Sequence, residues 1–192
     1  MKTRLAKKIG NKKATNVYKR LAENTIKKIY PLHRKKVEII IAYTPRNKKD
    51  KIKKWINYPF AFYAQKGRNL GERLSNAVKW GFQNKAKKII IIGSDCPNLS
   101  LSTIDKTIRE LSGSDIVLGP AFDGGYYLVG LNNNKSFLFK NIHWSTSKVL
   151  EKTLDKIKEA KLTYKLLLIK YDIDTIEDYK MYMEEKKSIL RR

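Results

Sequence analysis

Apolar residues follow two different patterns along this chain, and the two patterns predict two kinds of secondary structure. Residues 14–29 repeat apolar side chains every three to four positions, which is typical of one helical face, and Pro31 ends this segment. By contrast, VEIIIAY (37–43) and KKIIIIGS (87–94) are continuous apolar runs, as expected for strands that are buried on both faces. The chain therefore combines amphipathic helices with buried strands.

The rest of the chain continues this alternation. We predict further strands at 60–65, 115–121, 126–131 and 164–171, and further helices at 70–82, 102–111, 147–160 and 175–190. Two capping boxes, Ser102 with Asp105 and Thr175 with Asp178, indicate where two of these helices begin. The alternation predicts an α/β fold, a three-layer sandwich in which helices cover both faces of a mostly parallel central sheet. No linker or repeat divides the chain, so we expect one domain over residues 1–192.

The composition is that of a globular protein with a strong positive charge. Hydrophobic residues make up 42% of the chain and the formal net charge is +24, but the lysines are spread over nearly every segment. Such a charge attracts phosphates, whereas scattered lysines are typical of solvated surfaces and do not predict a specific nucleic-acid site. No apolar run approaches the roughly 20 residues of a membrane span, and no signal-peptide pattern opens the chain. The single cysteine, Cys96, fits a reducing compartment, so we expect a cytoplasmic protein.

Asp95 is the strongest candidate for chemistry. It follows the strand of four isoleucines at 89–92, and ligands in open α/β sheets bind outside the carboxyl ends of the strands. A carboxylate there suits a hard divalent cation that also binds substrate phosphates. A turn capped by the side chain of Asp95 explains the same residue equally well.

Other carboxylates and glycines follow later strands. In GPAFDGGYYLVGL (119–131), Gly124 and Gly125 form a turn that can approach a ligand closely, with Asp123 beside it, although Asp-Gly also suits an ordinary turn. Asp172 and Asp174 alternate at the end of the strand predicted at 164–171, and either can reach a cation held by Asp95.

The remaining candidates are weaker. Lys2 and Arg4 can hold phosphate oxygens, and Trp144 with Ser145 can stack on and hydrogen-bond a sugar, although Ser145 also suits a helix N-cap. Cys96 has no activating base placed by a motif, so it is a poor candidate for a nucleophile. Neither GxxxxGK[ST] nor GxGxxG is present, which argues against a P-loop NTPase and a dinucleotide enzyme.

Taken in order, six segments resemble a single family: KTRLAKKIG, QKGRNLGERLSNA, IIIIGSDCPNLS, DIVLGPAFDGGYYLVGL, HWST and DIDTIED. They are similar to the bacterial and archaeal GT-A-like glycosyltransferases often associated with arsenosugar biosynthesis, a label that we do not carry to this chain. The resemblance implies a Rossmann-like nucleotide-diphospho-sugar transferase fold that binds a nucleotide sugar and a divalent metal, Mg²⁺ or Mn²⁺. It also implies that KTRL contacts phosphate, that Leu70, Gly71 and Arg73 belong to the nucleotide site, and that Asp95 binds the metal.

The chain departs from this family in two places. Glycosyltransferases of this fold typically hold their metal with D-x-D, whereas Asp95 is followed by Cys96 and Pro97. The second ligand must then come from elsewhere, first from Asp174 and otherwise from Asp123. Family members also carry an apolar strand and a loop before KTRL, so the first strand is missing here. We expect a misassigned start codon, which an intact mass of the natively expressed protein beginning at Met1 would contradict.

These features predict a metal-dependent transfer of a sugar from a nucleoside-diphosphate sugar to a small-molecule acceptor. Lys2, Arg4 and Arg73 would help to neutralise the departing diphosphate, and Asp123 would act as general base. The alternative within the same fold is nucleotidyl transfer with release of pyrophosphate. A non-catalytic nucleic-acid-binding module is the alternative from a different class. The oligomeric state stays open.

Overall fold

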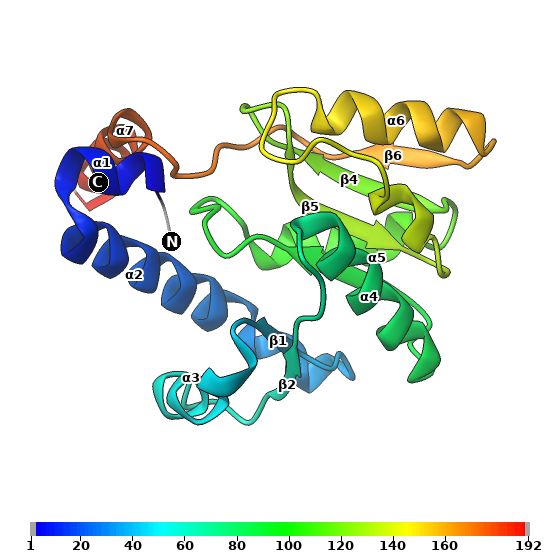
Figure 1. The fold of residues 1–192 in the computed structure, drawn as a ribbon, viewed down its shortest axis with the longest axis horizontal. Coiled ribbons are helices and arrows are strands. Elements are labelled where there is room, and N and C mark those ends of the chain that lie inside the picture. Colours follow the sequence, from blue (N-terminus) through cyan, green and yellow to red (C-terminus); the bar gives the residue numbers. More distant parts are fainter. Residues whose placement is uncertain (1–2, 191–192) are drawn as a thin grey trace.

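The computed structural model describes residues 3–190 (Figure 1). Its helices are α1 (Thr3–Ile9), α2 (Asn11–Ile29), α3 (Lys49–Trp55), α4 (Leu70–Gln83), α5 (Leu101–Glu110), α6 (Val149–Glu159) and α7 (Ile176–Leu190). Its strands are β1 (Ile40–Tyr43), β2 (Ala61–Ala64), β3 (Ile89–Ile92), β4 (Ile116–Pro120), β5 (Tyr126–Leu131) and β6 (Tyr164–Leu166). Short 3-10 helices lie at η1 (Tyr30–Lys35), η2 (Arg46–Lys48) and η3 (Ser136–Phe139). Every predicted helix and strand is present, and α1 and α3 are additional.

The strands form two sheets, a division that the sequence pattern did not predict. β1 and β2 pair in parallel, and a second sheet has the order β3-β5-β4-β6. In this larger sheet β4 is parallel to β6, whereas β5 runs antiparallel to both β3 and β4. Consequently β3, β4 and β6 point the same way, and their carboxyl ends lie at one edge.

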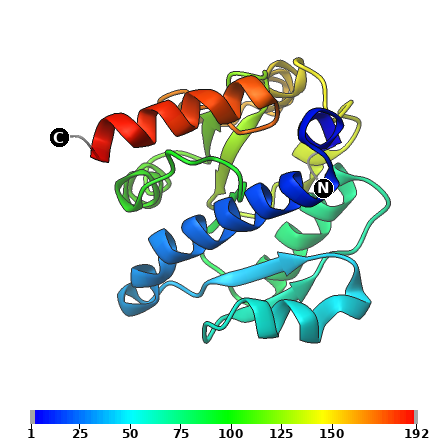
Figure 2. The ribbon, with the colours of Figure 1, turned by 90° about the vertical axis from the view of Figure 1, so that its left-hand side faces the viewer.

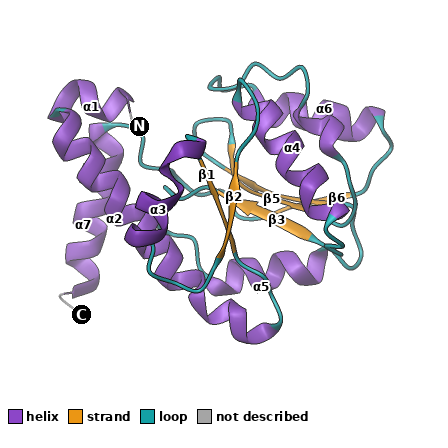
Figure 3. Cartoon of the chain, turned by 60° about the horizontal axis from the view of Figure 1, so that its bottom comes forward, coloured by secondary structure: helices purple, strands orange, loops and turns teal. Residues whose placement is uncertain are grey.

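Helices cover both faces of the larger sheet, as predicted for a three-layer α/β fold (Figure 3). Along β4, the side chains of Ile116 and Leu118 pack on the face covered by α4 and α6, whereas Val117 packs on the face covered by α5. The alternation follows from the two-residue period of a strand. Since both faces are buried, β4 and β5 are apolar throughout.

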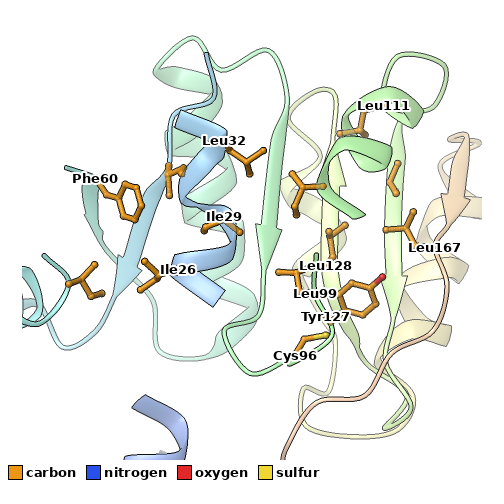
Figure 4. Close-up of a cluster of buried hydrophobic side chains, with 14 residues drawn as sticks. Ile26, Ile29, Leu32, Phe60, Cys96, Leu99, Leu111, Tyr127, Leu128 and Leu167 are labelled. Carbon is orange, nitrogen blue, oxygen red and sulfur yellow. The ribbon is translucent and has the colours of Figure 1, made fainter. Parts of the chain in front are cut away.

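A hydrophobic cluster joins the two sheets, which share no strand pairing (Figure 4). Ile26 and Ile29 of α2 and Leu32 of η1 lie between the side chains of the smaller sheet and those of the larger sheet. Phe60 joins this cluster before β2, and Leu128 joins it from β5. The C-terminal half of α2 therefore fixes the position of the loop that follows β3.

The two ends of the described chain pack against each other through α1, α2 and α7 (Figures 1 and 2). Leu5 is fully buried in this cluster, together with Val17, Leu21 and Ile173. The segment KTRL, expected to be a phosphate-contacting loop, is thus helical from Thr3 onward. Leu5 anchors this helix because its burial removes an apolar side chain from water.

The helix caps correct one prediction and confirm another. Ser100, not Ser102, caps α5, because its side chain accepts a hydrogen bond from Thr103 N at 3.3 Å. The cap before α7 is as predicted: Asp178 Oδ2 accepts from Thr175 N at 2.7 Å, and Thr175 Oγ1 accepts from Asp178 N at 3.2 Å. This reciprocal pair fixes where the chain leaves the sheet and enters the last helix.

Candidate functional site

The carboxyl edge of the larger sheet brings together the strand-end residues that the sequence singled out. Asp95 follows β3 and Asp123 follows β4. Gly125 precedes Tyr126, where the antiparallel strand β5 begins. The antiparallel direction of β5 explains this convergence, because a short turn between β4 and β5 stays at the same edge.

The segment that follows β6 crosses this edge and reaches the loop of Asp95. Leu167 N donates to Leu118 O at 2.8 Å, Lys170 N donates to Pro120 O at 3.0 Å, and Ile173 N donates to Asp95 O at 3.2 Å. The predicted strand at 164–171 is thus shorter than expected, and the chain continues in extended form beside β4. Asp172 and Asp174 flank Ile173, so the structure brings the backbone of Asp95 beside the predicted second ligand, Asp174.

Polar side chains of α2 and the crossing segment hold the loop after β3 in place. Thr25 Oγ1 donates to Ser94 O at 3.4 Å, and Ser94 Oγ donates to Tyr18 Oη at 3.1 Å. Lys170 Nζ donates to Asn98 O at 2.6 Å, and Lys28 Nζ donates to Pro97 O. These bonds satisfy carbonyl groups of an irregular loop and fix the position of Asp95.

Cys96 is a packing residue of this loop. Only 1% of its surface is exposed, and it belongs to the cluster of Figure 4. Burial, followed by the negative charge of Asp172, raises the pKa of the thiol to about 12. A thiol held protonated in this way is a poor nucleophile, which agrees with the low rank given to Cys96 on sequence grounds.

Asp123 lies exposed in the turn between β4 and β5, and its side chain accepts a hydrogen bond within that turn. Its Oδ1 accepts a hydrogen bond from Gly125 N at 2.9 Å. Gly124 has a positive φ of 84°, and a side chain there would overlap with the carbonyl of Ser147. Leu150 N donates to Gly124 O at 2.8 Å, so this turn packs against the start of α6.

The first turn of α4 is braced by its own side chains. Asn69 caps the helix by accepting from Glu72 N at 2.9 Å, and Glu72 Oε2 accepts from Arg68 N at 2.8 Å. Arg73 Nε donates to Gly67 O at 3.2 Å. Arg73, expected in the nucleotide site, therefore also holds the loop before α4, while Leu70 at the helix start is 45% exposed.

Trp144 and Gly71, two predicted binding residues, are in contact. A side chain at Gly71 would overlap with the indole nitrogen of Trp144 and the carbonyl of Phe139. The indole ring also lies 6.2 Å from the ring of Tyr126, centroid to centroid. A cavity of about 460 Å³ opens beside Gly71 and Trp144, between α4 and the residues that follow η3. Sequence reasoning missed this cavity because its walls come from segments separated by about 70 positions.

Ser145 and the N-terminal basic residues complete the set of candidates. Ser145 is exposed with a positive φ of 66°, and it does not cap α6, whose N-cap is Lys148. Lys2 lies outside the described residues, and for Arg4 the structure describes only its backbone place in α1. No helix among residues 3–190 is long and apolar enough to span a membrane.

Asp95 and Asp174 are the carboxylates at the sheet edge that could hold a divalent cation. Within the described part of the chain, no three His, Cys, Asp or Glu side chains form a cluster that could hold a metal. Mg²⁺ is commonly held by one or two carboxylates together with substrate phosphates. Asp95 and Asp174 offer that number of carboxylates, and Asp172, for which the sequence gave no preference, is a third close to Cys96.

Comparisons with known proteins agree with this geometry. A crystal structure of a proposed nucleotide-diphospho-sugar transferase of Desulfovibrio desulfuricans G20 matches with a TM-score of 0.90 and 32% identity. The match covers 100% of this chain and 84% of that chain. By its fold and this similarity the chain is a transferase enzyme of the nucleotide-diphospho-sugar transferase class, as the sequence resemblance implied. Residues 30–146 match the family described as "Uncharacterized protein conserved in bacteria (DUF2064)", and the chain belongs to that family.

More distant structures share the fold. The 4-diphosphocytidyl-2C-methyl-D-erythritol synthase of Anaerococcus prevotii DSM 20548 has a TM-score of 0.61 and 15% identity, over 90% of this chain and 89% of that chain. Rv0371c of Mycobacterium tuberculosis H37Rv, solved as a complex with manganese, has a TM-score of 0.57 and 13% identity, over 85% of each chain. No curated protein matches the chain.

Proposed function

We propose that the protein transfers a sugar from a nucleoside-diphosphate sugar to a small-molecule acceptor with the help of Mg²⁺ or Mn²⁺. The observation that carries this proposal is the hydrogen bond from Ile173 N to Asp95 O, which joins the Asp95 loop to the segment of Asp172 and Asp174. This contact gathers carboxylates at the edge where α/β sheets bind ligands. The 32% identity to a proposed nucleotide-diphospho-sugar transferase supports the class of substrate, and the manganese complex of Rv0371c supports the use of a metal in this fold.

The site residues would have different roles in binding and transfer. Asp95 and Asp174 would hold the cation, which when bound offsets the charge of the departing nucleoside diphosphate. Lys2 and Arg4 would contact the phosphates. Leu70 and Arg73 at the start of α4 would line the nucleotide, with Ser145 beside the sugar. Gly71 and Trp144, which are in contact, would form the wall between this site and the neighbouring cavity.

Asp123 would accept the proton of the acceptor hydroxyl. It is exposed at the carboxyl edge, and the hydrogen bond from Gly125 N to its Oδ1 orients the carboxylate. The turn of Gly124 and Gly125 packs against the start of α6, which would hold Asp123 at a fixed distance from the sugar. A positioned carboxylate of this kind contributes as a general base only within hydrogen-bonding reach of the reacting hydroxyl.

Binding measurements test the metal site directly. A panel of nucleoside-diphosphate sugars, with and without Mn²⁺, is first screened for an increase in the melting temperature. For the best ligand, calorimetry is expected to show metal-dependent binding that Asp95→Ala weakens at least about tenfold, because a carboxylate ligand is lost. Asp50→Ala, which changes an exposed carboxylate of α3, is the matched control and should bind like the wild type. Unchanged metal-dependent binding by Asp95→Ala would contradict the metal role.

Nucleotidyl transfer is the second candidate, and the fold shared with the diphosphocytidyl-methylerythritol synthase favours keeping it. In that reaction a phosphorylated small molecule attacks a nucleoside triphosphate and pyrophosphate is released. The two reactions differ in the product that leaves. Release of a nucleoside diphosphate from a nucleotide sugar supports glycosyl transfer, whereas release of pyrophosphate from a nucleoside triphosphate supports the alternative.

A further inference from the structure

The cavity between α4 and the chain after η3 has the properties of a binding site for a small polar molecule. Its volume of about 460 Å³ lies in the range of ligand pockets, roughly 300–1,000 Å³. One wall comes from α4, and the other comes from residues 139–144. Both walls are fixed, because Asn69 and Glu72 brace the start of α4 and Gly71 contacts Trp144 and Phe139.

Ser75 and Trp144 are two members of the cavity lining that carry hydrogen-bonding groups. Ser75 lines the cavity and is only 5% exposed, and its hydroxyl makes no hydrogen bond to another described residue. Trp144, which is half-buried, also lines the cavity, and its indole Nε1 donates no hydrogen bond to another residue among 3–190. Neither group is sealed from solvent, so a ligand with its own donors and acceptors can take the place of the water that bonds to them.

The remaining lining determines the chemistry of such a ligand. Phe139 and Ile142 are buried beside the cavity, so the half-buried Trp144 provides most of the apolar surface that a ligand can contact. An apolar ring face beside a hydroxyl and an indole N–H is suited to a hydroxylated ring, which offers C–H groups on its faces and hydroxyls at its edge.

Each of the two walls of the cavity carries a lysine. Lys79 lies on α4 and Lys140 follows η3, and neither forms an ion pair within the described part of the chain. Glu72 also lines the cavity and brings one negative charge, and its two oxygens accept hydrogen bonds from Arg68 N and Asn69 Nδ2. The two lysines outnumber the single carboxylate of the lining, and this net positive charge favours an anionic group on the ligand.

The cavity adjoins the carboxyl edge of the sheet through one aromatic contact. Trp144 lies against Tyr126 at 6.2 Å between ring centroids, and Tyr126 directly follows the turn of Asp123, Gly124 and Gly125. The Trp144 and Tyr126 rings would thus lie between a molecule in the cavity and the turn that carries the proposed general base.

We propose that this cavity is the acceptor subsite and that it binds a hydroxylated small molecule carrying an anionic group, a phosphate or a carboxylate. Binding in the cavity follows from its lining, whereas its role as acceptor subsite rests on the proposed function. The experiment therefore measures binding in the absence of nucleotide sugar and metal.

Tryptophan fluorescence provides the titration, with glucose 6-phosphate, glucuronate, glucose and inorganic phosphate as probes. We expect at least one of the two anionic sugars to change the emission and to bind at least about tenfold more tightly than glucose or inorganic phosphate. Trp144→Phe should remove the change in emission, since the other two tryptophans, Trp55 and Trp80, pack elsewhere. Glucose binding as tightly as both anionic sugars would overturn the anionic assignment, and no binding by any sugar would overturn the proposal as a whole. A preference for glucose 6-phosphate or for glucuronate identifies the anionic group.

Variants locate the binding in the cavity. Ser75→Ala should weaken binding of the anionic sugar by about 3- to 10-fold through the loss of one hydrogen bond. Its melting temperature should stay close to that of the wild type. The double variant Lys79→Ala/Lys140→Ala should weaken binding of the anionic sugar about tenfold and leave the affinity for glucose unchanged. The matched control is Lys27→Ala/Lys106→Ala, which removes two exposed lysines from α2 and α5. Equal affinity in Ser75→Ala and in the cavity lysine variant would place the binding outside the cavity.

Different results would contradict the proposed function and the proposed acceptor subsite. Asp95→Ala should leave binding of the anionic sugar unchanged, because Asp95 is proposed to act only on the metal and diphosphate. A protein that binds the anionic sugar in the cavity but shows no metal-dependent binding of any nucleotide sugar would retain the subsite and contradict the proposed function. A protein with the opposite behaviour would retain the function and contradict the subsite.

Discussion

The indole of Trp144 lies directly against the backbone of Gly71, and only a glycine allows this contact. A Cβ at position 71 would overlap with Trp144 Nε1 and with the carbonyl of Phe139. The contact joins the first turn of α4 to the chain after η3, two segments that are distant in sequence. It therefore defines one end of the cavity in which we place the acceptor.

Gly71→Ala should separate these two segments and deform the cavity. We expect the free energy of unfolding to fall by about 1–3 kcal/mol, because the added methyl group overpacks a site closed by backbone and an aromatic ring. Urea denaturation measures this change, and Trp144 emission reports the displacement of the ring. Gly113→Ala is the control, since a Cβ there meets nothing within 4 Å. A Gly71→Ala variant as stable as Gly113→Ala, with unchanged emission, would contradict the contact.

Gly124→Ala should be more harmful than Gly125→Ala in the same turn. Gly124 has a positive φ, and a Cβ there would overlap with the backbone of Ser147, so the turn must move away from the start of α6. We expect a loss of stability of about 2 kcal/mol or more. A Cβ at Gly125 meets only the side chain of Asp123, at 3.1 Å, which can shift. Thermal unfolding of the two variants gives the comparison, and equal melting temperatures would be inconsistent with the packing of this turn on α6.

Cys96 should not react with thiol reagents in the folded protein. Its side chain is buried and its pKa is raised to about 12, so at pH 8 only about one thiol in ten thousand is ionised. The absorbance released by a disulfide reagent such as DTNB should therefore stay near zero until denaturant is added, when one thiol per chain reacts. Rapid labelling of the native protein would mean that the loop after β3 opens readily.

Asp115 should make the protein less stable in acid. Thr163 N and Oγ1 donate to its Oδ2 at 2.9 and 2.8 Å, and these bonds, together with Lys135, lower the pKa of Asp115 from 3.8 to about 2. Because the folded-state pKa is the lower one, the unfolded chain takes up the proton first, and stability is lost as the pH falls from about 4 to about 2. The carboxylate remains partly exposed to solvent, so we expect this loss to be about 1 kcal/mol.

The variant Asp115→Asn tests this dependence. At neutral pH it should cost about 1–2 kcal/mol, because Lys135 loses the carboxylate of a partly exposed ion pair and keeps only its hydrogen bond to Asn132 Oδ1. Below pH 4 the difference between the variant and the wild type should shrink, which denaturation curves at several pH values will show. Asp50→Asn is the control for an exposed carboxylate. A constant difference across this pH range would contradict the assignment.

Local patterns in the sequence predicted most of the secondary structure. The period of α2, the isoleucines of β3 and the capping box of Thr175 and Asp178 each depend on residues close in sequence, and the structure has them as expected. The cap of α5 was displaced by two residues, because Ser100, Ser102 and Thr103 are all suitable capping residues and their hydroxyls hydrogen-bond one another. The strand at 164–171 ended early because its later half pairs only at Lys170.

The candidate site was predictable in its types of residue but not in its arrangement. Asp95, Asp123 and Asp174 could be selected because each follows a predicted strand. Which of them come together depends on the direction of β5 and on the path of residues 167–174 across the sheet edge. The contact between Gly71 and Trp144, and the cavity beside it, depend on the packing of η3 against α4 and carry no local signal.

The sequence by itself therefore determined the fold class, the strand-end carboxylates and the family resemblance, because these depend on residue types and on short-range spacing. Tertiary structure alone decided that the strands divide into two sheets, that Ile173 brings Asp174 beside Asp95, and that Ser75 and Trp144 face one cavity. The physical reason is that short-range patterns report whether a residue is buried. The partner against which it is buried is selected by packing among segments that are far apart in the chain.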